Sequence, residues 1–231
     1  MDEKETAVVT KSLDQAELAW DYPVRYGTPE WETLKTVEEQ FNAYNIPVEI
    51  LKNISTEELV KVCLAYPEWG LIHAYNSRGT GLFALAKLFN GFRELFNRED
   101  AATALMNEYA KIDPLAVGQD WTPLEQGLYS FQLEKIELFL LQKQMILKLN
   151  EDGMRHLKEM TLTKYQKKKM LPEIYSLWDF CPTVGICANI IEIKNANLLE
   201  DKRAEINYFK YYLMCEDIQF LDSIVELLNQ I

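Results

Sequence analysis

Polar side chains that could take part in chemistry gather around His73, one of only two histidines in the chain. Asn76 and Arg78 follow it, and a histidine beside an arginine is typical of a general base next to an anion-binding group. A general base also needs a partner that orients it, and the sequence identifies none. His73 is therefore a candidate catalytic residue, with Asn76 and Arg78 as candidate binding residues. We favour the alternative of a partly buried histidine that is bonded to a backbone carbonyl.

The segment 78–81, Arg-Gly-Thr-Gly, has the composition of a phosphate-binding loop. It lacks the spacing G-x-x-x-x-G-K-[ST], and no strand is expected before it. We expect Gly79 and Gly81 to end one helix and to allow the turn into the next.

A cluster of cations lies in segment 155–169 of a chain whose net charge is −12. It consists of Arg155, Lys158, Lys164, Lys167, Lys168 and Lys169, with His156 among them. Such a basic patch could meet RNA, an acidic protein surface or phospholipid headgroups. The alternative is a solvated helix end, where lysines complement the helix dipole. Because only Tyr165 could stack on a base there, we predict no nucleic-acid binding.

Motifs for metal binding, nucleotide binding and nucleophilic catalysis are absent from the sequence. We therefore predict no metal site and no cofactor. The four cysteines are Cys63, Cys181, Cys187 and Cys215. Cys181 and Cys187 are close enough in sequence to form a disulfide in an oxidising compartment, although nothing in a chain of this length demands one.

Helical periodicity runs through almost the whole chain. Nine glycines and eight prolines are few for 231 residues, and this argues against the many turns of a β-sandwich or barrel. The sequence predicts an all-α fold, an irregular bundle of about eight to ten helices. No repeat of fixed period appears, so a regular solenoid is not expected.

Local signals place the individual helices. Ser55 with Glu58 and Thr122 with Glu125 have the spacing of capping boxes, which open helices. We expect the helix after Thr122 to reach about Asn150 and to be the central one, because its middle is apolar all round. Further helices are expected over 29–41, 48–51, 56–66, 69–75, 81–96, 101–112, 151–169, 172–181, 184–193, 201–214 and 217–230. The one over 81–96 either continues or kinks at Gly91.

Domain and compartment signals are sparse. We expect residues 1–19 to form a flexible acidic segment and residues 20–231 a single helical domain, with a candidate sub-boundary at 113–121. The chain begins without the basic start and apolar stretch of a signal peptide, and no run approaches the roughly 18 apolar residues of a membrane span. The sequence thus predicts no transmembrane segment. It leaves the location open between cytoplasmic and, if a signal has been removed, periplasmic, cell-surface or secreted.

Two series of motifs lie between Trp20 and Leu105. The first is Trp20-Asp21-Tyr22-Pro23-Val24, Gly27-Thr28-Pro29-Glu30-Trp31, Ile46-Pro47 and Ser55-Thr56-Glu57-Glu58-Leu59, and the second is Cys63-Leu64, Tyr66-Pro67, Ala74-Tyr75-Asn76 and Phe89-Asn90-Gly91-Phe92-Arg93-Glu94-Leu95. Together they resemble an uncharacterised family of bacterial helical proteins, many of them exported. The resemblance implies a bacterial source and a location outside the cytoplasm, and it assigns no activity and no site residues.

The function we expect first is a non-enzymatic binding or adaptor domain, which would engage a protein or a surface ligand through a groove between helices. One alternative is an enzyme with its site near His73. Another is an acidic inhibitor or immunity-type protein, since the negative charge, concentrated early in the chain, favours a basic partner. The ligand and the oligomeric state stay open.

Overall fold

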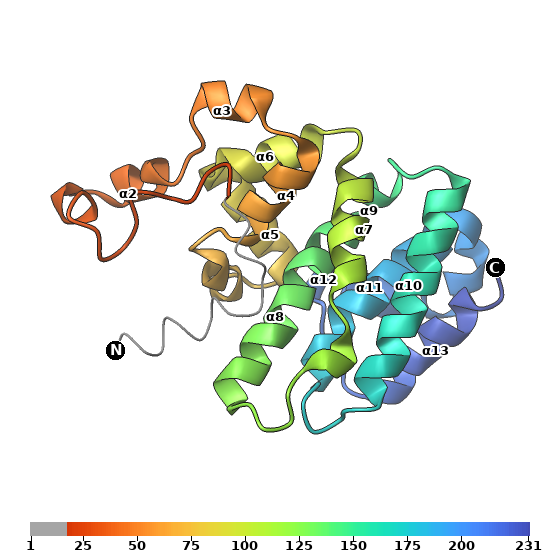
Figure 1. The fold of residues 1–231 in the computed structure, drawn as a ribbon. Coiled ribbons are helices and arrows are strands. Elements are labelled where there is room, and N and C mark those ends of the chain that lie inside the picture. The colour runs from red at the N-terminus through yellow and green to blue at the C-terminus, as the bar shows by residue number, and fades with distance from the viewer. Residues whose placement is uncertain (1–17) are drawn as a thin grey trace. The chain divides into compact units, whose positions relative to one another are not determined.

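The computed structural model describes residues 18–231, and every regular element in this part of the chain is a helix (Figure 1). The predicted all-α fold is therefore confirmed, as is the irregular packing without a repeat. Of the expected N-terminal segment 1–19, all but the last two residues lie outside the described part of the chain.

The described residues divide into two compact units, which we call the N-terminal unit (18–105) and the C-terminal unit (106–231). The division falls inside helix α7 (Ala101–Lys111) rather than in the loop 113–121. That loop belongs to the C-terminal unit, where the hydroxyls of Tyr129 and Tyr175 donate to the carbonyls of Asp113 and Pro114. The two units are compact parts of the region 20–231, for which a single helical domain stays the prediction.

The N-terminal unit is built from short helices. In chain order they are η1 (Trp31–Thr33), α2 (Val37–Ala43), α3 (Val48–Asn53), α4 (Thr56–Leu64), η2 (Trp69–Ala74), α5 (Arg78–Leu88) and α6 (Asn90–Asn97). Helix α6 packs against α4 and α5, and α5 packs against η2. The capping box of Ser55 and Glu58 opens α4 as predicted.

An aromatic cluster forms the core of the N-terminal unit. Tyr66 stacks on Phe89 with ring centroids 4.6 Å apart. The rings of Tyr22, Tyr44 and Phe92 surround Tyr66 at centroid distances of 5.3–6.1 Å. Four of these five residues belong to the motifs that resemble the bacterial family. In this structure those motif residues serve packing.

Two helices predicted in this unit are interrupted. The helix expected over 29–41 is split because Thr36 starts a new one: its hydroxyl accepts from the Glu39 amide, and the Glu39 carboxylate accepts from the Thr36 amide. The helix expected over 81–96, continuous or kinked at Gly91, breaks two residues earlier, at Phe89, which has an extended backbone. The Asn90 side chain then bonds to both backbone groups of Ile46, at 2.9 and 2.8 Å. At both breaks side chains bond to backbone groups at the start of the new helix: Thr36 and Glu39 do so at the first, and Asn45 accepts from the Asn90 amide at 2.8 Å at the second.

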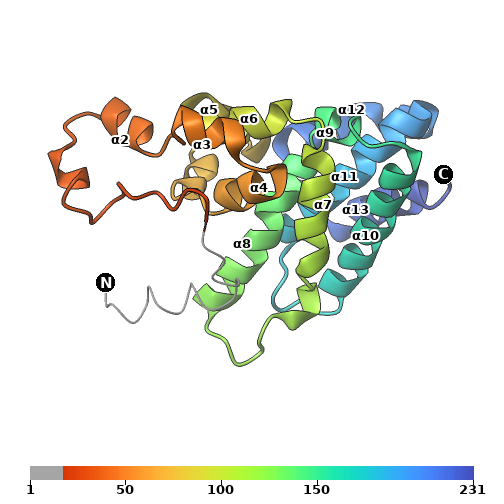
Figure 2. The same ribbon diagram turned by 45° about the horizontal axis from the view of Figure 1, so that its top comes forward.

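The C-terminal unit is arranged around helix α11 (Leu177–Asn195), as the two views in Figures 1 and 2 show. Its other elements are η3 (Pro114–Ala116), α8 (Pro123–Leu140), α9 (Lys143–Ile146), α10 (Glu151–Lys169), η4 (Ala196–Lys202), α12 (Arg203–Tyr212) and α13 (Ile218–Leu228). Helices α8, α9, α10, α12 and α13 all pack against α11. Residues 180–191 of α11 are buried without interruption.

The central helix is therefore not the one predicted. The helix that Thr122 caps ends at Leu140, and α9 follows after a break, so it does not reach Asn150. The pieces expected over 172–181 and 184–193 are instead one helix that contains Pro182. Pro182 has no backbone N–H and so removes one donor from the helix. Side chains donate to two other backbone carbonyls close to it. The Cys181 thiol donates to the Leu177 carbonyl, and the Lys168 ammonium donates to the Asp179 carbonyl.

Candidate functional site

The structure does not gather His73, Asn76 and Arg78 on one exposed face. His73 lies on η2 and is exposed, because the inward positions of this short helix are taken by Trp69 and Ile72. Asn76 is also exposed, whereas Arg78 is buried at the start of α5. The favoured expectation of a partly buried His73 is wrong.

The segment 78–81 begins a helix rather than ending one. Ser77 and Thr80 form a capping box, in which the Ser77 hydroxyl accepts from the Thr80 amide at 3.1 Å and the Thr80 hydroxyl accepts from the Ser77 amide at 3.2 Å. Gly79 and Gly81 therefore lie inside α5. A Cβ atom at Gly81 would stand 2.6 Å from the carbonyl oxygen of Ile72, so this glycine allows α5 to pack closely on η2. Its role is packing and not phosphate binding.

The six cations of the predicted basic patch point to different sides of α10. Lys164 and Lys168 are buried, and the others are partly or fully exposed. Each has its own partner: Arg155 pairs with Asp152, Lys158 with the Ile231 carbonyl oxygen, Lys164 with the Ile112 carbonyl, Lys167 with Asp113, Lys168 with Glu137, and Lys169 with Asp222. The cations therefore form no single basic surface.

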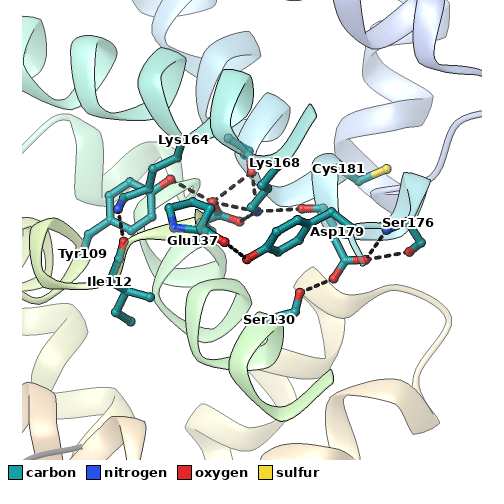
Figure 3. A network of polar contacts seen from close by, with 12 residues as sticks. Tyr109, Ile112, Ser130, Glu137, Lys164, Lys168, Ser176, Asp179 and Cys181 are labelled. Carbon is teal, nitrogen blue, oxygen red and sulfur yellow. Dashed lines mark hydrogen bonds and ion pairs between the residues drawn. The ribbon is translucent and has the colours of Figure 1, made fainter. Parts of the chain in front are cut away.

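The most concentrated polar chemistry of the C-terminal unit lies in its interior, where Glu137 of α8 meets Lys168 of α10 (Figure 3). The side chain of Glu137 is 0 % exposed and that of Lys168 is 1 % exposed. The Lys168 nitrogen lies 3.1 Å from Oε1 and 3.0 Å from Oε2 of Glu137. Tyr109 of α7 and Thr183 of α11 each donate to Oε1, at 2.7 and 2.8 Å.

This buried network uses all of its donors. The Lys168 ammonium has three protons, and its acceptors are the Glu137 carboxylate, the Thr183 hydroxyl and the Asp179 carbonyl, the last two at 2.8 Å. The Tyr109 and Thr183 hydroxyls each donate a hydrogen bond to Glu137. A buried ion pair is tolerated when hydrogen bonds satisfy its remaining valences, as they do here. The network therefore joins α7, α8, α10 and α11 from within.

A second set of polar contacts continues the network to the start of α11 (Figure 3). Asp179 accepts from the Ser176 amide at 2.8 Å and from the Ser176 hydroxyl at 2.6 Å, which caps the helix. The other Asp179 oxygen accepts from the Ser130 hydroxyl of α8. A capping carboxylate thus also ties two helices together.

Burial in this interior disfavours the charged forms of the ionisable side chains around the ion pair. Burial raises the pKa of the Tyr109 hydroxyl, and the Glu137 charge raises it further. Burial lowers the pKa of Lys164 to about 8, against the opposing effect of Glu137 and Asp113. On the same grounds the pKa of Lys135, buried on α8, falls to about 8. Because Glu137 and Lys168 are closed off from solvent, the arrangement can hold helices together but does not present a reactive group to a substrate.

Sequence reasoning missed this network, although one signal was available. Glu137 directly precedes the apolar run 138–141, and ionised side chains beside such a run are rarely buried unless they are paired. A partner for Glu137 could have been inferred, but its identity could not. Lys168, counted among the surface cations, lies 31 positions away along the chain.

The cysteines are not paired as the sequence suggested. The Cys181 sulfur lies 3.8 Å from the sulfur of Cys215. Cys187 instead donates to the Thr183 carbonyl. All four cysteines are free thiols in the structure, and Cys215 alone is partly exposed. Residue spacing favours neighbours such as Cys181 and Cys187, whereas the fold brings a residue from beyond α12 to Cys181.

Exposed tyrosines mark the outer face of α12. Tyr208 is 60 % exposed and Tyr211 is 54 % exposed. Both rings contact Tyr212, at centroid distances of 4.5 and 4.7 Å. Ile206 and Phe209 face the interior of the unit. The helix therefore buries one apolar face and presents a second, aromatic face to solvent. Ala204, Tyr208 and Tyr211 follow each other along this exposed face, and we call these three residues the tyrosine stripe.

The described residues also lack two features of other kinds of site. Among residues 18–231, no group of three histidine, cysteine, aspartate or glutamate side chains is placed to hold a metal ion. In the same residues, no helix has both the length and the apolar character needed to cross a membrane. Comparison of the chain with models of protein families, with curated proteins and with solved structures finds no match.

Proposed function

We propose that this protein is a non-enzymatic binding domain, and that the tyrosine stripe of α12 binds a basic segment of a partner protein. The observation that carries the proposal is the exposure of Tyr208 and Tyr211 on a helix whose apolar face is already buried. Tyrosine is enriched in protein interfaces, because a large rigid ring gives contact area at a small entropic cost.

The charge around the stripe supports a basic partner. Glu205 lies on α12 itself, and Asp201 before it and Glu216 after it are also exposed. The segment carries basic residues too, but Arg203 pairs with Glu200 and Lys210 pairs with Glu192. Lys202 donates to the Ser223 hydroxyl. Exposed tyrosine rings attract arginine and lysine side chains through cation–π contacts. The net charge of −12 adds a long-range attraction for the same kind of partner.

The interior supports the non-enzymatic part of the proposal. The groups that most resemble catalytic machinery, Glu137 and Lys168, are closed off and bonded to one another. A general acid or base must reach its substrate directly or through one water molecule. A structural role accounts for this network without any reaction.

A random peptide library displayed on phage tests the proposal with a defined probe. We expect selection on the immobilised protein to enrich peptides rich in arginine and lysine. Their affinity, measured by fluorescence polarisation, should fall at least about tenfold in the double variant Tyr208→Ser/Tyr211→Ser, because each truncation removes an aromatic contact. Binding should also weaken as salt is raised, since part of it is charge attraction.

The matched control is Tyr26→Ser, which removes an exposed tyrosine from the N-terminal unit and should leave peptide affinity unchanged. Enriched peptides that bind the double variant as well as the unaltered protein would contradict the proposed surface. Turnover of a hydrolase substrate that is lost in His73→Ala would contradict the non-enzymatic function and support a site at the exposed His73.

The acidic inhibitor or immunity-type protein is the second candidate, and the net charge of −12 favours it. It differs from the first in the consequence of binding: the partner would be a basic enzyme whose activity stops on contact. The enriched peptides separate the two. The inhibitor function is supported if the consensus sequence of the peptides matches a segment at the active site of a basic enzyme. The whole protein should then also inhibit that enzyme.

A further inference from the structure

Two cysteines of the C-terminal unit lie almost within bonding distance. Cys181 is in the second turn of α11, and Cys215 is in the connection between α12 and α13. Their sulfurs are 3.8 Å apart, and a disulfide bond is about 2.05 Å long. A movement of less than about 2 Å would therefore join them.

The connection that carries Cys215 is the part free to make this movement. Residues 213–217 lie outside regular helix, between the last residue of α12 and the first of α13. Leu213 begins them with a left-handed backbone, φ 52°, which ends α12. Cys181, in contrast, is fixed in a helix whose surroundings are packed. Closure thus requires a shift of the connection and not of the core.

Access distinguishes the four thiols. Cys215 is partly exposed, whereas Cys63, Cys181 and Cys187 are buried. Burial raises the pKa of the Cys215 thiol, and its contact with Cys181 lowers it in part. An external reagent therefore meets Cys215 first, and Cys181 is the one thiol placed to react next.

We propose that Cys181 and Cys215 are a modification site, at which a low-molecular-weight disulfide converts the two thiols into an intramolecular disulfide. The Cys215 thiolate attacks one sulfur of the reagent and forms a mixed disulfide, and the first reagent thiolate leaves. The Cys181 thiolate then attacks the Cys215 sulfur, and the second reagent thiolate leaves. Two protein thiols are oxidised, one reagent disulfide is reduced to two thiols, and the two protons pass to the leaving thiolates.

The new bond would link the central helix α11 to the connection between α12 and α13. It would close a loop that contains all of η4 and α12. Closing such a loop restricts the unfolded chain and thereby favours the folded state. The bond would therefore act as a covalent clamp on the part of the unit that carries the tyrosine stripe.

Treatment of the folded protein with excess oxidised glutathione tests the site. Remaining thiols are alkylated under denaturing conditions, and the digest is mapped by mass spectrometry. We expect one cross-linked peptide pair, Cys181 with Cys215, and alkylated Cys63 and Cys187. The midpoint of thermal unfolding should rise by roughly 5–10 °C and return when dithiothreitol is added.

Three variants show the order of the steps. In Cys181→Ala the reaction should stop at a glutathione adduct on Cys215, because the second thiol is missing. In Cys215→Ala neither an adduct nor a cross-link should form in the folded protein. The matched control Cys187→Ala should form the Cys181–Cys215 cross-link as the unaltered protein does.

Several outcomes would overturn the proposal. They are a Cys181–Cys187 cross-link, a cross-link between two chains, an adduct on Cys181 in the Cys215→Ala variant, and a fully alkylated set of cysteines after treatment. A cross-link that forms only in denaturant would also contradict it, because the proposal rests on the folded arrangement. None of these outcomes depends on whether the tyrosine stripe binds a partner.

Discussion

At the scale of single residues, partners decide what an ionisable side chain does. Lys168 and Lys169 are neighbours in the sequence, yet Lys168 is bonded inside the unit to Glu137 and Lys169 pairs with Asp222 at the surface. A buried charge that loses its partner is costly, whereas an exposed ion pair contributes little. Two lysines one position apart therefore contribute very differently to the free energy of unfolding.

Removal of the buried cation tests this difference. We expect Lys168→Met to lower the free energy of unfolding by about 3–5 kcal/mol, because Glu137 is then a buried charge without its counter-ion. Denaturant unfolding followed by circular dichroism measures the change. The matched control Lys169→Met should cost at most about 1 kcal/mol.

A second variant separates lost charge pairing from lost packing. In Lys168→Met/Glu137→Gln the remaining amide can still accept from Tyr109 and Thr183, and neither position of the former ion pair carries a charge. Part of the lost stability should therefore return. If the double variant is less stable than Lys168→Met, the cost lies in packing and the interpretation of Glu137 as an uncompensated charge fails.

Lys135 gives a pH dependence of known sign. Burial lowers its pKa in the folded protein to about 8, below the usual value of 10.5. Between these two values the unfolded state holds more protons, so this residue makes stability rise with pH. We expect the unfolding free energy of the unaltered protein, relative to that of Lys135→Met, to increase from pH 7 to pH 10. A difference that is constant with pH would contradict burial as the cause.

At the scale of elements, capping residues and one glycine determine where helices begin and how closely they pack. The boxes at Ser55, Ser77 and Thr122 open α4, α5 and α8. Gly81 then allows α5 to approach the backbone of η2. This close approach places α5 against the helix that carries His73, so the supposed chemical segment is a packing contact.

Substitution of Gly81 tests this role. We expect Gly81→Ala to lower the midpoint of thermal unfolding and to cost about 1–3 kcal/mol, because its Cβ would stand 2.6 Å from the Ile72 oxygen. The control is Gly127→Ala on α8, where a Cβ meets nothing within 4 Å. There the alanine should be neutral or should stabilise by about 0.5–1 kcal/mol. Equal effects at the two positions would rule out close packing as the reason for Gly81.

At the scale of the whole molecule, two units with different kinds of core divide the chain. The N-terminal unit is centred on stacked aromatic rings, and the C-terminal unit on an apolar helix with an ion pair beside it. Exposed aromatic residues and an acidic surface are what remain for interaction. The proposed peptide contacts and the thiol pair both lie in the C-terminal unit.

Fold class and many helix starts follow from the amino-acid sequence, because periodicity and capping act between residues three or four positions apart. It also predicted the helical state of residues 184–193 despite their β-branched side chains, and the structure confirms this. Three facts came from the packing of the folded chain: α11 is central, Lys168 faces Glu137, and Cys181 lies beside Cys215. These facts depend on contacts between residues 31 and 34 positions apart and on which faces pack together. Local spacing carries no information about such contacts.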